Sequence, residues 1–198
     1  MIRLACLAAF ACLAMILAAC AGAPPERFYS LIAEPLTAAP VAATAASPGV
    51  SVGPVTVPEA VDRPQIVVRV GANQVAVVEG HRWDEPLKQA IARVVAANLS
   101  RGGLAAVTSR QAAAQDTALR VTIDVQRFES VPGDSVTLEA VWSVRRTSGA
   151  EVRAGHSVLR EPCASAGYNA LAAAHSLALA KLSEQIAAAI EAMQATSR

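Results

Sequence analysis

Three segments in the C-terminal half of the chain alternate apolar and polar residues with the period of two that is typical of a half-buried β-strand. They begin near Leu119, Val136 and Val152. The connections Pro132-Gly133-Asp134 and Thr147-Ser148-Gly149 have the composition of hairpin turns. This pattern predicts an antiparallel β-meander in which each strand has one buried face.

Two further β patterns precede the meander. Residues 50–57 carry valines whose alternation breaks at Gly53-Pro54, which predicts a bulge or bend in this strand. Residues 65–70 and 74–78 flank the turn sequence Gly71-Ala72-Asn73. These two segments predict a second hairpin.

Helical spacing appears twice. The first helix is predicted over about 84–101, with Asp84 as the N-cap, Pro86 in the first turn and Gly102-Gly103 as the stop. The second is predicted over about 165–194, where one apolar stripe runs the whole length. The stripe consists of Tyr168, Leu171, His175, Leu179, Leu182, Ile186, Ile190 and Met193. Core packing is the expected role of this stripe, and a homo-oligomer interface is the alternative.

These elements predict an α/β fold with a single domain over residues 28–198. Its mixed, largely antiparallel sheet would end in the C-terminal meander and would be packed by the two main helices. Between the first helix and the meander lie a short apolar run, 104–107, and a polar, alanine-rich connection, 109–117. Residues 33–49, rich in alanine and proline, are predicted to form a flexible surface linker inside the domain.

Residues 1–19 have the composition of a bacterial export signal: Arg3, an apolar run over 4–17, and small residues before Cys20. The sequence Leu17-Ala18-Ala19-Cys20 resembles the lipobox of bacterial lipoproteins. That resemblance implies lipidation of Cys20 and cleavage before it, and Ala21 implies the outer membrane as destination. An uncleaved anchor is the alternative, because residues 4–23 contain no charge and are long enough to span a bilayer. Residues 20–27 would form a lipidated tether ahead of a short strand-like segment at Phe28-Tyr29.

Removal of the signal would leave a mature chain over 20–198, whose length suits one domain. The mature chain would carry 16 basic and 16 acidic residues, so we expect no nucleic-acid partner. Cys163 would be its one cysteine besides the lipidated Cys20. An inert, half-buried thiol is the expected state of Cys163, and an intermolecular disulfide is the alternative.

Sequence motifs for catalysis are missing: no nucleophile elbow, metalloprotease motif or nucleotide-binding loop occurs. His81 is predicted in a loop, His156 in a strand and His175 in the core, without the spacing of metal ligands. We therefore expect no enzyme activity, no metal and no cofactor other than the lipid on Cys20. Arg145-Arg146 would lie in a solvated turn or contact lipid headgroups.

Short motifs follow one another along the mature chain. They are Phe28-Tyr29-Ser30-Leu31, Val52-Gly53-Pro54-Val55 with Pro58, the segment 62–67, Arg82-Trp83 with Pro86-Leu87, Phe128-Glu129, the segment 138–142 and the segment 168–171. In their order and spacing the chain resembles the PqiC family of ABC-type transport auxiliary lipoproteins, the partners of MCE-protein lipid-transport systems. The resemblance covers nearly all of the mature chain except the linker.

The resemblance implies a non-enzymatic lipoprotein on the periplasmic face of the outer membrane. It would dock an MCE-domain protein and, through it, an ABC permease and ATPase. The candidate contact residues are Phe28, Tyr29, Asp62, Arg63, Pro64, Arg82 and Trp83. For Arg63 a turn-fixing or buried ion pair is the competing interpretation, and for Trp83 a hydrophobic staple at the helix entry.

Two other functions fit the same anchor and architecture. A periplasmic lipid carrier would require an internal cavity lined by aliphatic side chains. An envelope-assembly or pilot lipoprotein of another complex would require neither a cavity nor an MCE partner.

Overall fold

A computed structural model describes residues 25–34, 49–112, 117–149 and 151–196. The predicted signal peptide, Cys20 and nearly all of the predicted linker lie outside these residues. The strands are β1 (Arg27–Tyr29), β2 (Gly49–Thr56), β3 (Gln65–Gly71), β4 (Gln74–Trp83), β5 (Ala105–Thr108), β6 (Leu119–Val131), β7 (Ser135–Arg146) and β8 (Val152–Pro162). The helices are α2 (Leu87–Arg101), α3 (Ser109–Ala112) and α4 (Tyr168–Thr196), with a 3-10 turn η1 (Glu59–Val61).

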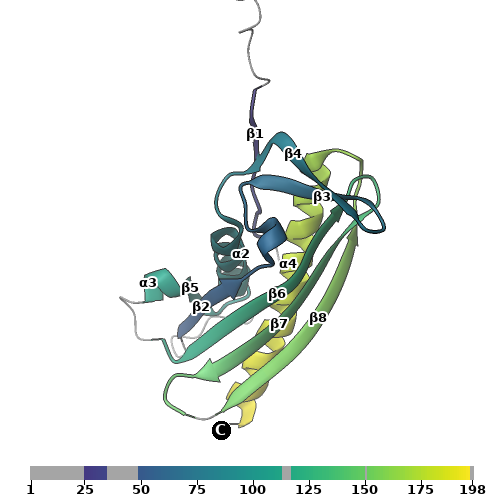
Figure 1. The fold of residues 1–198 in the computed structure, drawn as a ribbon. Helices are drawn as coiled ribbons and strands as arrows, with labels where there is room; N and C mark the ends of the chain where they lie inside the picture. Colours follow the sequence, from purple (N-terminus) through teal and green to yellow (C-terminus); the bar gives the residue numbers. More distant parts are fainter. Residues whose placement is uncertain (1–24, 35–48, 113–116, 150, 197–198) are drawn as a thin grey trace, which may run out of the picture.

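The strands form two sheets, where the sequence pattern had suggested one. The larger sheet has the order β5-β2-β6-β7-β8, and the smaller has the order β1-β4-β3. Helix α4 lies along one face of the meander and also packs against α2, which covers β2 and β5. Figure 1 shows no described helix over the other face of β6, β7 and β8. The predicted α/β class with two main helices and a C-terminal meander is confirmed.

The meander follows the predicted alternation, with one irregularity. Val121 and Val144 are fully buried, as are the other inward positions up to Val125. The register of β6 against β7 then shifts between Val125 and Arg127. Because one inserted residue reverses the side on which each later side chain lies, Phe128 is buried although its position breaks the earlier period.

The bend predicted in β2 is also present. The register of β2 against β6 shifts between Val52 and Val55, and the Gly53-Pro54 peptide bond is cis. Gly53 has φ of 126°, and a Cβ atom there would lie 2.5 Å from the Ser109 Oγ atom. Both the conformation and the close approach require glycine at this position.

Helix α2 begins three residues later than predicted, at Leu87. Pro86 occupies the N-cap position without a side-chain hydrogen bond, so Asp84 is not the N-cap. Asp84 instead joins α2 to the N-terminal strand, because its carboxylate accepts a hydrogen bond from the Ser30 hydroxyl and its backbone N–H donates to the Tyr29 carbonyl at 3.0 Å.

Helix α4 buries the predicted stripe and more. Leu171, Leu179 and Ile186 are fully buried, and Ala174 and Ala178 extend the buried surface around the helix. The extra width reflects two partners, the meander on one side and α2 on the other. Small residues in α4 allow this close packing, so core packing of the stripe is confirmed.

The smaller sheet places two segments differently from expectation. The predicted strand at Phe28-Tyr29 is present and pairs in parallel with β4. His81 lies in β4, so its prediction in a loop is wrong. Strand β4 continues past an irregularity at Gly80, where φ is 75°. It reaches Trp83 because β1 pairs with its last three residues. The predicted connection after residue 108 begins with the short helix α3.

Candidate partner-binding groove

Most of the candidate contact residues meet at one surface pocket of about 380 Å³, which we call the tether groove. The pocket lies where β1, the turn before β3, the end of β4 and the start of α2 come together. It is lined by Phe28, Asp62, Arg63, Pro64, Arg82, Trp83, Asp84, Glu85, Pro86 and Leu87. Tyr29 is the one predicted contact residue outside this lining.

The parallel pairing of β1 with β4 explains which side chains face the groove. Phe28 is opposite Arg82, and Tyr29 is opposite Trp83. Successive side chains of a strand lie on opposite faces of the sheet, so Phe28 and Arg82 share one face. The Phe28 ring is 61% exposed. A large apolar side chain this exposed is available for contact with a partner.

Tyr29 anchors β1 from the other face of the small sheet. Its hydroxyl lies 2.7 Å from His81 Nδ1, and its ring is stacked on the imidazole. The Tyr168 ring at the start of α4 lies 4.1 Å from the imidazole, measured between ring centroids. Tyr29 therefore fixes the strand that follows the predicted tether, and does so outside the groove.

The Asp62–Pro64 turn is fixed to its neighbours by backbone and side-chain contacts. The Trp83 backbone N–H donates to the Pro64 carbonyl at 2.8 Å. Lys88 of α2 forms an ion pair with Asp62, with 2.7 Å between Nζ and Oδ2. Among the described residues, Arg63 has no ion-pair partner and its side chain is exposed. The ion pair of this turn therefore belongs to Asp62, and the Arg63 guanidinium is available at the edge of the groove.

Trp83 connects the groove to the core. Its side chain is only 6% exposed, and its ring meets Phe128 and His175 edge to face at centroid distances of 6.0 and 6.2 Å. The Trp83 ring therefore contacts β6 and α4, and the same residue also lines the groove. This position makes Trp83 a rigid apolar wall of the groove.

Charged and apolar groups both line the groove. Arg82 forms an ion pair with Glu26, with 2.6 Å between Nη2 and Oε1, while its Nε is buried without a hydrogen-bond partner among the described residues. Phe28, Trp83 and Leu87 supply apolar surface. No serine, threonine, cysteine or histidine is present in the described lining. This combination suits binding of a polypeptide segment and offers no nucleophile paired with a base.

The sequence reasoning missed the contribution of Asp84, Glu85 and Pro86 as part of the site. From the sequence, Asp84 is interpreted only as a signal for the start of the helix, and Pro86 as such a signal and as part of a family motif. Their presence follows from the direct connection of β4 to α2, which places these residues beside Arg82 and Trp83. A short strand-to-helix connection next to two candidate residues was the available signal.

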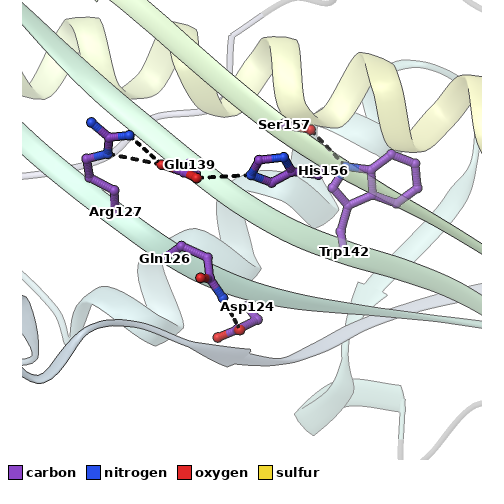
Figure 2. A network of polar contacts seen from close by, with 7 residues as sticks. All are labelled: Asp124, Gln126, Arg127, Glu139, Trp142, His156 and Ser157. Carbon is purple, nitrogen blue, oxygen red and sulfur yellow. Dashed lines mark hydrogen bonds and ion pairs between the residues drawn. The ribbon is translucent and has the colours of Figure 1, made fainter.

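The histidines outside the small sheet have structural partners. His156 Nε2 lies 3.0 Å from Glu139 Oε1, and Arg127 binds the same carboxylate on the open face of the meander (Figure 2). These two partners hold the pKa of Glu139 below its ordinary value, with Arg127 the larger cause. His175 is buried, its Nε2 lies 2.8 Å from Ser130 Oγ, and burial lowers its pKa to about 3. The prediction of a core histidine is confirmed.

Cys163 lies in the loop between β8 and α4 as a half-buried free thiol. Burial, and secondarily the charge of Asp134, raises the pKa of this thiol.

Arg146 faces inward and forms an ion pair with Glu151 at 2.7 Å, whereas Arg145 is exposed. No described group of three or more acidic, histidine or cysteine side chains is arranged to hold a metal ion.

Within the described part of the chain, none of the helices has the length and apolar content needed to cross a membrane.

Comparisons with other proteins extend these observations. A sequence comparison with curated proteins finds no match. Among solved structures, protein XCC0632 from Xanthomonas campestris, of the family DUF330, is 23% identical with a TM-score of 0.67, covering 87% of this chain and 98% of that one. A crystal structure of an uncharacterized protein is 18% identical with a TM-score of 0.68, covering 84% of this chain and 99% of that one. At these identities the two structures establish the fold.

The family comparison addresses the role of the chain. The family model described as the ABC-type transport auxiliary lipoprotein component matches residues 29–187. This range includes all the described strands and helices except the two ends, from Tyr29 in β1 to the greater part of α4. The chain therefore belongs to the family of ABC-type transport auxiliary lipoprotein components, the PqiC-like family.

Proposed function

We propose that this protein is a non-enzymatic lipoprotein of the outer membrane that docks the periplasmic MCE-domain protein of an ABC-type lipid-transport system. Family membership supplies the coarse role, an auxiliary lipoprotein component of ABC-type transport. The proposal adds lipidation at Cys20 after removal of residues 1–19, the periplasmic face of the outer membrane, and the identity of the partner.

The observation that carries the proposal is the convergence of six candidate contact residues on the tether groove. These residues come from three separate parts of the chain, and β1 is the described strand closest in sequence to Cys20. Phe28 lies eight positions after Cys20, a reach of at most about 28 Å. A partner in this groove would be held near the membrane that carries the lipid.

The lipid anchor has a direct physical role in this proposal. One acyl chain binds a bilayer only marginally, whereas two or more hold a protein stably. Labelled palmitate should enter the wild-type protein and should not enter Cys20→Ala. Equal labelling of both would contradict lipidation at Cys20.

The docking role is tested by photocrosslinking in cells. A photoreactive phenylalanine analogue placed at Phe28 or Arg63 of the full-length lipoprotein should form an adduct with the MCE-domain protein. Val70 provides the control, because it is similarly exposed at 56% but lies at the end of β3 away from the groove. Mass spectrometry would identify the adduct. Equal adduct formation from Val70, or no adduct with an MCE-domain protein, would contradict the proposal.

A further inference from the structure

An arginine pair lies on the face of the large sheet that the described helices leave uncovered. Arg120 of β6 and Arg145 of β7 are direct cross-strand partners in the antiparallel register. Their sequence neighbours Val121 and Val144 are fully buried toward α4, so the two arginines point to the opposite, open face. Both side chains are exposed.

Nothing in the described part of the chain neutralises this pair. Arg120 and Arg145 have no ion-pair partner there, and like charges directly opposite each other in a sheet are destabilising. The flanking pair in the next row is uncharged, Thr122 with Ser143, whose hydroxyl oxygens are 2.8 Å apart. Two exposed guanidinium groups directly opposite each other therefore concentrate positive charge at this place on the open face.

The carboxylates closest along this face are already occupied. Asp124 accepts hydrogen bonds from the Thr56 hydroxyl and from Gln126, and Glu139 binds Arg127 and His156 (Figure 2). The nearby Glu151 binds Arg146. No carboxylate described on this face is therefore left for the arginine pair, and an external anion can serve as its counter-charge.

We infer that Arg120 and Arg145 bind an acidic segment of a partner protein. Opposed side chains in an antiparallel sheet begin about 5 Å apart, so the two guanidinium groups can engage neighbouring carboxylates by paired hydrogen bonds. This inference rests on the proposed function, because the partner is taken to be the same transport protein.

Two observations favour a protein over an anionic membrane surface. Electrostatic attachment to lipid uses a cluster of roughly four to eight basic residues, and this row of the sheet offers two. The pair is also far from the strand that leads to the lipid anchor. Trp83, beside β1, contacts Phe128. Arg120 lies eight positions before Phe128 in β6, about 26 Å from it at ~3.3 Å per residue. Figure 1 shows β1 and the β7–β8 turn at opposite ends of the molecule.

The test is crosslinking in cells with the full-length lipoprotein. Photoreactive residues would replace Val141 or Val152, which lie on the same face as Arg145 and are 43% and 39% exposed. The expected adduct is the protein trapped from the tether groove, joined through a peptide rich in Asp and Glu. Arg120→Glu with Arg145→Glu should lower the adduct yield roughly tenfold. Lysine substitutions in that acidic peptide should restore it.

A matched control carries the same change in charge elsewhere. Arg110 and Arg153 are exposed, have no ion-pair partner among the described residues, and lie outside the open face. Arg110→Glu with Arg153→Glu should leave the adduct unchanged. If the glutamate variant of the arginine pair fails to fold, Arg120→Gln with Arg145→Gln decides the question, because it removes both the charge and the repulsion.

Each outcome has one meaning. Adducts only with lipid, adducts insensitive to charge reversal, or no adduct from the open face overturn the inference, while a partner trapped at Phe28 leaves the proposed function standing. An MCE-domain protein trapped through an acidic peptide at Val152 but not at Phe28 supports the inference and rejects docking in the tether groove. A missing adduct at every position rejects both.

Discussion

His175 should make this domain less stable in mild acid. Its imidazole is buried against Phe128, with ring centroids 3.8 Å apart and planes within 7°. Burial lowers its pKa to about 3, against about 6.5 in the unfolded chain. At pH 5 the folded protein keeps His175 neutral, whereas the unfolded chain binds a proton there. The unfolded state is thereby favoured by about 2 kcal/mol relative to pH 7.5, because the proton-binding term grows by about 1.4 kcal/mol per pH unit below 6.5.

The sign and size follow from the depressed pKa. Stability from the neutral histidine is fully present above pH 6.5 and is lost as pH falls from 6.5 toward 3. Between pH 7.5 and 5 the size depends almost entirely on the unfolded-state pKa, since any folded pKa below about 4 gives the same result.

Urea unfolding of residues 21–198 at pH 7.5, 6 and 5 measures the effect. His175→Gln keeps a donor for Ser130 but cannot titrate, so its free energy of unfolding should fall by about 2 kcal/mol less over this range than that of the wild type. Gly149→Ala is the control, because it changes no titratable group, meets nothing within 4 Å, and should leave the slope at the wild-type value. Parallel slopes for wild type and His175→Gln would refute the reasoning.

Three other predictions concern packing, a surface ion pair and the free thiol. Gly155→Ala would place a Cβ atom 2.3 Å from Trp142 Cζ2, so overpacking should lower the free energy of unfolding by about 1 to 3 kcal/mol, whereas Gly149→Ala meets nothing within 4 Å and should be tolerated. Asp62→Asn should change thermal stability by less than about 1 kcal/mol, because the ion pair with Lys88 is solvent-exposed; a larger loss would show that the turn depends on it. Cys163 should react with iodoacetamide at pH 7.5 more slowly than a free cysteine peptide, because burial and Asp134 raise the pKa of the thiol, and equal rates would contradict this.

Local patterns predicted the strands and helices well, because each element buries one face. Its apolar residues therefore recur along the sequence with the period of that element. The early part of β6 shows this, since Val121 and Val125 are both buried as its alternation requires. The register shift before Arg127 was less apparent, because a bulge reverses the pattern within one residue. Phe128 was the available sign, since a large apolar residue occupies a position that the earlier alternation assigns to solvent.

The two-sheet arrangement and the groove depended on distant pairing that local patterns do not encode. Phe28 is paired with Arg82, which is remote from it in the sequence, and their parallel ladder is only three residues long. A segment this short has too few positions for a period to specify its partner. The candidate contact residues could therefore be chosen as separate motifs, while their meeting in one pocket required the fold.

If one partner binds both the tether groove and the arginine pair, a change at one site should also affect binding at the other. The groove lies beside the small sheet and the arginine pair at the far end of the large sheet, and α4, a helix of 29 residues or about 43 Å, contacts strands of both sheets. Two contacts on one rigid body raise the effective concentration of the second once the first has formed. Charge reversal at Arg120 and Arg145 should then also weaken crosslinking from Phe28, although the groove itself is unchanged. Independent responses of the two positions would mean that they engage different partners, and the domain would then be a bridge between two components.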